Sequence, residues 1–272
     1  MEQVSRQVGQ PIVIENRAGG GNTIGMGVVA RADPDGYTLL VNSSTHTVTT
    51  AIRSSLPFDT LADFTAIVPL ASLPLVLVTT PGKGYKSVAD LVAYAKANRG
   101  KINYASAGAG NQSHLTAEMF RAASDFEAVH LPLKGSPEAV TEVLTGRADF
   151  YLCPITSALP MIQSGQLQGL AVTGAERLSA LPDVPTFSEL GFGNRIYGSW
   201  IGVFAPSKTP TPIKERLYAE ISKALVDPVV AKKLADAGTG RMPLTSAQFE
   251  QLVRDEIEAY SAVAKAANIR VN

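Results

Sequence analysis

The stretch Ile102-Asn-Tyr-Ala-Ser-Ala-Gly-Ala-Gly-Asn-Gln-Ser-His-Leu115 holds, in order, a short apolar run, a glycine-rich loop and the start of a helical pattern. The apolar run predicts a strand, and the loop leads that strand into a helix. Short β-branched or apolar runs alternate with segments of helical period along the rest of the chain. This alternation is typical of helices that cover a mostly parallel sheet, so we predict an α/β fold.

The same patterns place the individual elements. Strands are predicted at residues 11–15, 37–42, 66–79 (two strands, broken near Leu73-Pro74), 102–106, 128–132, 148–152, 167–173 and 199–205. Two helix starts have the spacing of a capping box, Ser87-Val-Ala-Asp90 and Thr245-Ser-Ala-Gln248. A third start is predicted at Ser136-Pro137, where a capping hydroxyl precedes a proline suited to the first helical turn.

Composition limits the classes of function. The chain has 272 residues with 45% hydrophobic content, which favours two moderate domains. Lysine plus arginine total 24 and aspartate plus glutamate total 24, so we expect no nucleic-acid partner, and any bound anion must be held locally. The longest uncharged stretches are interrupted by prolines, so the chain is not expected to be membrane-embedded. The single cysteine, Cys153, excludes an internal disulfide and is expected to be a buried structural thiol.

No flexible linker separates the two expected domains, so crossing strands should join them. The best crossing points are residues 102–106 and 199–205. Domain 1 is therefore predicted as residues 1–103 plus 206–272, and domain 2 as residues 104–205. Such crossovers would form a hinge that opens and closes a cleft around a ligand.

Catalytic motifs are not found. The sequence contains no nucleophile elbow, Walker loop, dinucleotide fingerprint or His-Glu-x-x-His motif, and Gly198 to Gly202 resembles an elbow only superficially. The histidines His46, His114 and His130 lack metal-ligand spacing, so no metal site is expected. An enzyme that uses Ser199 with His46 or His114 is kept as an alternative.

Three polar loops at strand ends offer donors for a carboxylate. Helix starts present backbone N–H groups and a partial positive charge, and the loops 106–114 and 134–137 both lead into predicted helices. The loop Asn42-Ser-Ser-Thr-His-Thr47 concentrates hydroxyl and amide groups directly after a strand. Simple helix capping is the favoured interpretation of each of the first two loops taken alone, and an ordinary polar loop would explain the third equally well. Together they favour a small polar or anionic ligand over a lipid.

Two further segments have structural interpretations. The run Gly19-Gly-Gly-Asn-Thr23 is interpreted as a tight turn, because no Lys-Ser or Lys-Thr follows it to bind a nucleotide phosphate. The segment Tyr197-Gly-Ser-Trp200 could supply an aromatic wall and a hydroxyl donor to a cleft. Core packing is the favoured interpretation of Trp200.

An ordered set of motifs extends through nearly all of the chain. It comprises Pro11-Ile-Val-Ile-Glu-Asn-Arg-Ala-Gly-Gly-Gly21, Pro34-Asp-Gly-Tyr-Thr-Leu-Leu40, Leu56-Pro-Phe-Asp59, Tyr104 to Leu115, Leu133-Lys-Gly-Ser-Pro137, Leu144-Thr-Gly-Arg-Ala-Asp149, Pro182 to Gly191 and Trp200-Ile-Gly-Val-Phe-Ala-Pro206. In this set the chain resembles the periplasmic solute receptors of tripartite tricarboxylate transporters, often called Bug receptors.

The resemblance implies two α/β domains of the periplasmic-binding-protein kind that close on a mono- or dicarboxylate without a cofactor. It also implies membrane subunits of a transporter as partners, a periplasmic location and, by default, a monomer. Family binding loops correspond to residues 42–47, 107–113 and 135–136. With the hydroxyl of Ser199 and the position of Cys153 added, the expected ligand-binding residues are Asn42, Ser43, Thr45, His46, Ala107, Gly108, Gly110, Asn111, Ser113, Gly135, Ser136, Cys153 and Ser199.

The chain departs from the family pattern in two ways. Family members usually begin with a signal peptide, a first strand and a Pro-Gly-Gly-containing loop, whereas the resemblance here starts at the helix that follows them. Relatives often carry an aspartate at the position of Cys153, which disfavours an amino-acid ligand here and favours a plain carboxylate. An amino-acid receptor and a metabolite sensor that signals to a partner protein stay open as alternatives.

Overall fold

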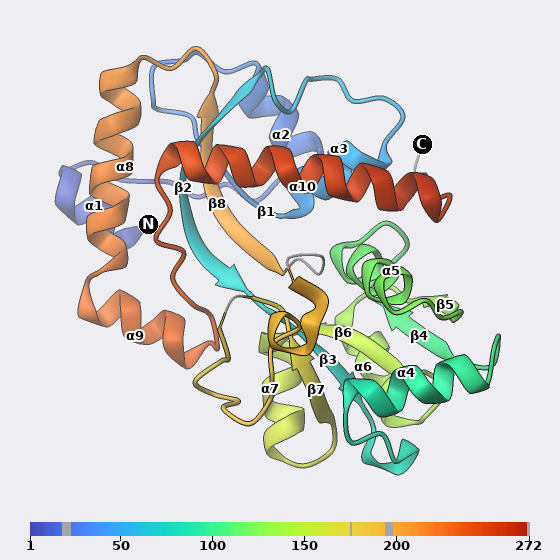
Figure 1. The fold of residues 1–272 in the computed structure, drawn as a ribbon. Coiled ribbons are helices and arrows are strands. Elements are labelled where there is room, and N and C mark those ends of the chain that lie inside the picture. The colour runs from blue at the N-terminus through green and yellow to red at the C-terminus, as the bar shows by residue number, and fades with distance from the viewer. Residues whose placement is uncertain (18–22, 175, 194–197, 271–272) are drawn as a thin grey trace. The chain divides into compact units, whose positions relative to one another are not determined.

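The computed structural model describes residues 1–17, 23–174, 176–193 and 198–270, and it has the predicted α/β fold (Figure 1). The chain divides into two compact units: Met1–Ser72, Trp200–Ala262 and Arg270–Asn272 form the first, and Leu73–Ser199 and Val263–Ile269 form the second. The first passage between units thus lies at Ser72-Leu73, well before the predicted crossing at 102–106, because the strand that follows pairs with strands of the second unit. The predicted cleft and hinge stay predictions.

The first unit contains a three-stranded sheet in the order β1-β8-β2. Strand β1 runs antiparallel to β8, with Asn42 opposite Gly202. One apolar core of this unit centres on Trp200, Phe204 and Phe249. The strands of this unit are β1 (Leu40–Ser43), β2 (Phe64–Leu73) and β8 (Ser199–Pro206), and its helices are α1 (Glu2–Val8), α2 (Thr23–Ala30), α3 (Thr45–Ile52), α8 (Thr211–Leu225), α9 (Pro228–Asp236) and most of α10 (Ser246–Ala266).

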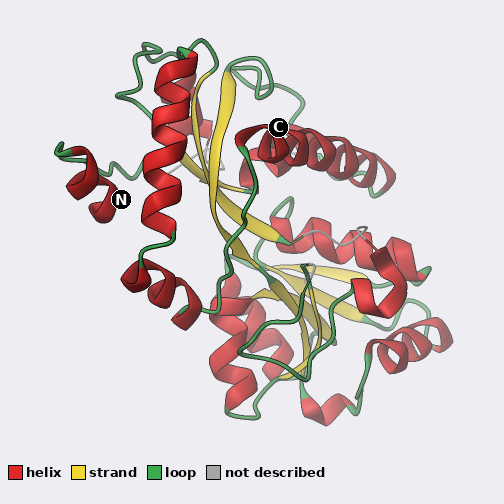
Figure 2. Ribbon diagram, turned by 60° about the vertical axis from the view of Figure 1, so that its left-hand side comes forward, coloured by secondary structure: helices red, strands yellow, loops and turns green. Residues whose placement is uncertain are grey.

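The second unit contains a five-stranded sheet in the order β5-β4-β6-β3-β7. The inner strands β6 and β3 are almost wholly buried, as continuous apolar runs require. The strands are β3 (Leu75–Thr79), β4 (Asn103–Ser106), β5 (Val129–Pro132), β6 (Phe150–Pro154) and β7 (Gln168–Val172). The helices are η2 (Pro81–Lys83), α4 (Val88–Ala97), α5 (Gln112–Ser124), α6 (Ser136–Leu144), α7 (Ile155–Gln163) and η3 (Ser188–Phe192). Figure 2 shows strands and helices in both units by colour.

Two predictions about the sheets are wrong. Strand β4 is parallel to β5 and β6, but β3 is antiparallel to both β6 and β7, so the second sheet is mixed rather than mostly parallel. The predicted strand at 11–15 does not form, and Val13 and Ile14 are 81% and 68% exposed. These β-branched residues have strand propensity but no partner strand, and an unpaired strand is not stable by itself.

The predicted helix starts at 87 and 245 are confirmed. The Asp90 N–H donates to Ser87 Oγ at 3.1 Å, and the Gln248 N–H donates to Thr245 Oγ1 while Gln248 Oε1 accepts from the Thr245 N–H. The third start is also at the predicted place, but Gly135 rather than Ser136 is its cap, and Ser136 is the first helical residue. Its hydroxyl is therefore available for another partner.

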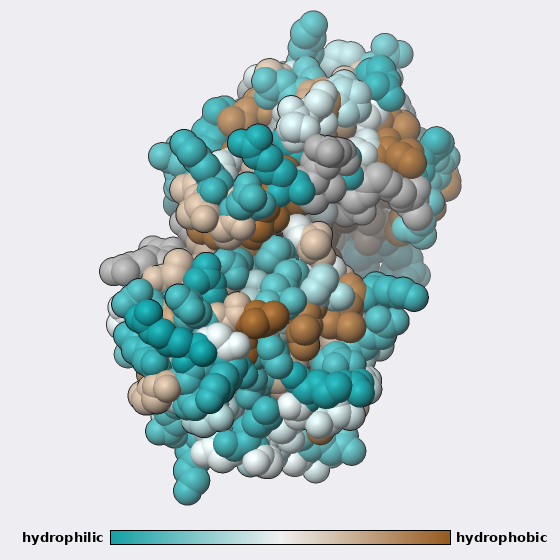
Figure 3. Space-filling model, turned by 90° about the vertical axis from the view of Figure 1, so that its right-hand side faces the viewer, coloured by the Kyte–Doolittle hydropathy of each residue, from teal (hydrophilic) through white to brown (hydrophobic). Residues whose placement is uncertain are grey.

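One face of the molecule is predominantly polar. Figure 3 shows hydrophilic residues over most of the visible face, with hydrophobic residues in small groups among them. In the described part of the chain, none of the helices combines the length and the apolar character needed to span a membrane. The predicted turn at residues 19–23 falls outside the described residues except for Thr23, as does Tyr197.

Candidate ligand-binding site

The loop between β4 and α5 is built from its own hydrogen bonds. Asn111 caps α5, with its Oδ1 accepting from the Ser113 N–H at 2.8 Å. The Ala107 N–H donates to Ser113 Oγ, and the Gly108 N–H donates to Ser106 Oγ. Gly108 and Gly110 have φ values of 135° and 71°, which a residue with a Cβ rarely adopts. The glycines are therefore required for the path that brings this loop into α5.

A second polar group begins helix α6. Ser136 Oγ lies 2.9 Å from the hydroxyl of Tyr151, which projects from β6. Ser113, in the first turn of α5, is also close enough to the Tyr151 hydroxyl to lower its pKa. Burial raises the pKa of Tyr151 to about 12, so its hydroxyl keeps its proton. The structure thus brings the predicted residues Ser113 and Ser136 together at one buried side chain.

The arrangement suits an anion. The amino ends of α5 and α6, with 13 and 9 residues, both meet at Tyr151. Each helix start carries a partial positive charge and unpaired N–H groups, which favour a carboxylate. The first turn of α5 has no acidic residue. In α6 the first-turn acid Glu138 accepts from the Lys134 N–H at 3.1 Å, outside the helix itself.

Cys153 lies on the same face of β6 as Tyr151. Its side chain is fully buried in the apolar cluster of the second unit, and burial raises the pKa of its thiol to about 12. The thiol is therefore neutral and shielded. The nearby acid Asp149 is already bonded to Lys83 Nζ at 2.8 Å and to the Asn103 N–H at 2.8 Å.

The loop Asn42–Thr47 belongs to the first unit. Asn42 is buried at the end of β1 and its Oδ1 accepts from the Ser43 N–H. The hydroxyls of Ser43 and Thr45 are 2.9 Å apart and half-buried. Ser43 and Thr45 are therefore the members of this loop whose hydroxyls are partly accessible.

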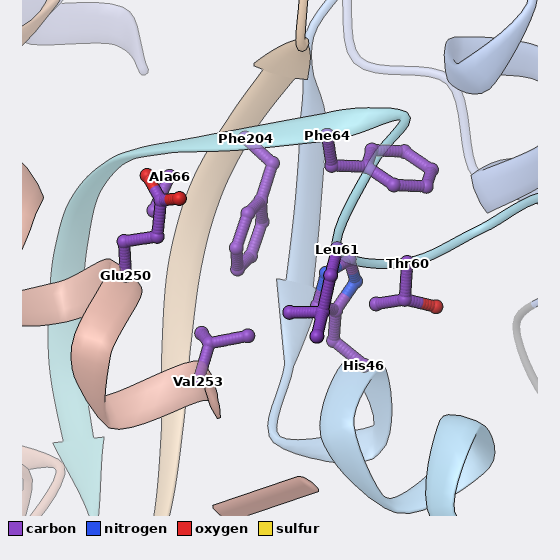
Figure 4. Close-up of a pocket in the computed structure, with 8 residues that line it drawn as sticks. All are labelled: His46, Thr60, Leu61, Phe64, Ala66, Phe204, Glu250 and Val253. Carbon is purple, nitrogen blue, oxygen red and sulfur yellow. The ribbon is translucent and has the colours of Figure 1, made fainter. Parts of the chain in front are cut away.

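His46 points the other way, into the core of the first unit. Its ring stacks on Phe204 with centroids 4.1 Å apart and is fully buried, and in the described part of the chain neither ring nitrogen has a hydrogen-bond partner. Burial lowers the pKa of His46 to about 3, so the ring is neutral. Figure 4 shows His46 at the wall of a small cavity, which is also lined by Thr60, Leu61, Phe64, Ala66, Phe204, Glu250 and Val253. The structure therefore separates His46 from the polar side chains of its loop.

The two remaining predicted residues, Ser199 and Gly135, lie in different elements. Ser199 begins β8 and is half-buried, next to Trp200, which is 2% exposed in the core as favoured from the sequence. Gly135 adopts an extended backbone as the cap of α6.

Sequence reasoning missed Tyr151 as a member of this group. A signal was available, because Tyr151 and Cys153 are two residues apart in a strand and therefore share a face. The contacts of His114 and His130 with the loop were also missed. His114 and His130 are 16 residues apart in sequence but stack with centroids 3.8 Å apart, because β4 and β5 are adjacent.

Comparison with known protein families gives a match over nearly the whole chain. Residues 1–269 match the model described as "Tripartite tricarboxylate transporter family receptor". The chain is 37% identical over 237 residues to the "UPF0065 protein in tcbD-tcbE intergenic region" of Pseudomonas sp., covering 87% of this chain and 70% of the relative.

Two solved structures are similar over nearly the whole chain. The Rpa4515 protein of R. palustris, solved with adipate, is 29% identical with a TM-score of 0.82 and covers 99% of this chain and 90% of its own. MatC (Rpa3494) from Rhodopseudomonas palustris, with bound malate, is 30% identical with a TM-score of 0.78 and covers 96% and 90%.

Proposed function

This chain belongs to the receptor family of tripartite tricarboxylate transporters, and from that premise we propose that it captures a small mono- or dicarboxylate for the membrane subunits of such a transporter. As a member of this family it is a solute-binding receptor and not an enzyme. We also propose a periplasmic location and a monomeric state, which osmotic-shock fractionation of cells and light scattering would test.

One observation is the main support for a carboxylate ligand. The starts of α5 and α6 meet at the Tyr151 hydroxyl, so two partial positive charges and the hydroxyls of Ser113 and Ser136 converge. We propose that a ligand carboxylate exchanges hydrogen bonds with these hydroxyls and with backbone N–H groups in the first turns of α5 and α6. The similar proteins solved with adipate and malate support this class, because both ligands are dicarboxylates. Ser43 and Thr45 are proposed as a second group of ligand donors.

A plain carboxylate is proposed over an amino acid. An ammonium group would need an acidic partner, and the two buried acids of the second unit are already engaged. Asp149 is paired with Lys83, and Glu118 accepts from the Tyr104 hydroxyl at 2.6 Å and pairs with Arg121 at 2.7 Å. The thiol of Cys153 supplies no charge to replace them.

Binding measurements test the proposal. Thermal unfolding and titration calorimetry with malate, adipate, succinate and glutamate should show a raised melting temperature with the plain dicarboxylates and a smaller rise with glutamate. Ser113→Ala and Ser136→Ala should each weaken dicarboxylate binding about tenfold, the order expected for a lost hydrogen bond to a charged group.

Thr141→Ala is the matched control, because Thr141 lies on the exposed side of α6 and its hydroxyl donates to Pro137 O. It should bind as the wild type does. A wild-type chain that is folded but unaffected by every carboxylate would refute the ligand class. Serine variants with unchanged affinity would refute the proposed site.

A further inference from the structure

Two histidines lie behind the loop that leads into α5. His114 is in the first turn of that helix and His130 is in β5. Their rings are almost parallel, with centroids 3.8 Å apart and an interplanar angle of 8°. The ring of Tyr104 lies nearly parallel to that of His130 at 4.8 Å. The aromatic group therefore forms a rigid support beside a loop whose glycines have little rigidity of their own.

Each histidine is bonded to the loop. The Gly110 N–H donates to His114 Nδ1 at 3.0 Å. His130 Nε2 is 2.6 Å from Ser106 Oγ, which in turn accepts from the Gly108 N–H at 3.2 Å. The two imidazoles thus fix both glycines that have positive φ, one directly and one through Ser106.

We propose that His114 and His130 are positioning residues that hold the loop Ala107–Ser113 in the conformation that binds the ligand carboxylate, and that they do so as neutral imidazoles. The inference rests on the proposed function for its ligand. Ordering a loop with two glycines costs conformational entropy, and a loop ordered in advance does not lose that entropy on binding. The histidines therefore act on affinity without touching the ligand.

The hydrogen bonds require the neutral form of His114. Its Nδ1 accepts a hydrogen bond from the Gly110 N–H, so that nitrogen carries no proton of its own. Two charged imidazoles at this separation would repel each other. Burial, followed by the neighbouring His130, lowers the pKa of His114 to about 4, and burial also lowers the pKa of His130. The ionisable groups around the pair are Tyr104 on β4 and Glu118 and Arg121 on α5, and Glu118 is bonded to both of the others.

Substitutions that keep or remove the acceptor test the role. In His114→Asn the amide oxygen can replace Nδ1, and in His130→Gln the amide group can replace Nε2. His114→Leu and His130→Leu remove these groups at similar volume. In titration calorimetry with succinate, malate and adipate at pH 7.5, the amide variants should bind within about threefold of the wild type and the leucine variants at least tenfold more weakly.

Amide exchange followed by NMR gives a second readout that does not need a ligand. The Gly110 amide proton should exchange at least tenfold faster in His114→Leu than in His114→Asn, with both variants folded by near-UV circular dichroism. The His114→Asn/His130→Gln double variant serves as the reference at each pH. Relative to this reference, the affinity of the wild type should fall as the pH is lowered through 4.

The outcomes separate the two proposals. If the wild type binds a dicarboxylate and the leucine variants bind it equally well, the positioning role is refuted and the receptor function stands. If no carboxylate binds but Gly110 exchange rises only in the leucine variant, the histidines hold the loop and the ligand class is refuted. Unchanged Gly110 exchange in His114→Leu refutes the positioning role in either case.

Discussion

At the scale of single residues, the buried acid Glu256 has an unusual environment. It is 2% exposed on α10, accepts from Trp200 Nε1 at 3.0 Å and lies 2.9 Å from Thr47 Oγ1. Thr47 Oγ1 is also 2.7 Å from Ser44 O, to which it donates. The Thr47 hydroxyl also donates to Glu256 Oε2, so its one proton is shared between the two acceptors. Burial raises the pKa of Glu256 to about 8, because the bonds from Thr47 and Trp200 offset the lost hydration of the carboxylate only in part.

The raised pKa predicts a dependence of stability on pH. The folded state holds the Glu256 proton up to about pH 8, whereas the unfolded chain releases it near its ordinary value of 4.5. The contribution to stability is thus fully present below about pH 4.5 and is lost as pH rises toward 8, by at most about 1.4 kcal/mol per pH unit. Glu256→Gln can keep both hydrogen bonds without a charge, so the variant should be the more stable protein at pH 8. Urea unfolding from pH 5 to 9 measures the difference, and parallel curves for the two proteins would contradict it.

Residue-level prediction from the sequence succeeded where the chemistry is local. The helix starts at Ser87 and Thr245 follow from the residue types and spacing of a capping box, and the structure has both caps. The position of His46 could not be predicted, because a histidine after a strand is equally compatible with a polar loop and with a stack on Phe204. Burial decides between them, and burial is a property of the packed chain.

At the scale of elements, β8 packs against α10 at Gly202. A Cβ at this position would overlap Cζ of Phe249, whose ring also contacts Trp200 and Phe204. Phe249 is fully buried and cannot move aside. Gly202→Ala should therefore destabilise the protein by about 1–3 kcal/mol, the usual effect of overpacking a core. Gly82→Ala is the control, because its Cβ would meet nothing within 4 Å. Equal urea midpoints for the two variants would show that the helix can shift at no cost.

The existence of elements was easier to predict than their pairing. The break near Leu73-Pro74 is confirmed by the end of β2 and the start of β3, because the proline lacks the N–H that continuous pairing requires. The direction of β3 could not be predicted. Its partners β6 and β7 lie more than 70 residues further along the chain, and an apolar run pairs equally well in either direction. The run at 11–15 is a related case. Its sequence favours a strand, but it pairs with no strand in the described part of the chain.

At the scale of the whole molecule, the absence of net charge bears on how an anion is recognised. Lysine and arginine balance aspartate and glutamate at 24 each, so long-range attraction of a carboxylate is weak. The proposed donors are hydroxyls, N–H groups and helix starts, which act over short distances. Recognition should then depend on the local geometry at Ser113, Ser136 and Tyr151 rather than on the field of the protein.

This distinction predicts a small effect of salt. Raising sodium chloride from 20 to 200 mM shortens the screening length from about 20 Å to below 10 Å, which weakens attraction between separated charges but not contacts at hydrogen-bond distance. The dissociation constant of a bound dicarboxylate should therefore change less than about threefold in titration calorimetry. Lys134→Gln, which removes the cation next to the cap of α6, should show the same affinity and the same small salt effect within that range. A tenfold loss of affinity with salt, or a large effect of Lys134→Gln, would mean that side-chain cations rather than helix starts hold the carboxylate.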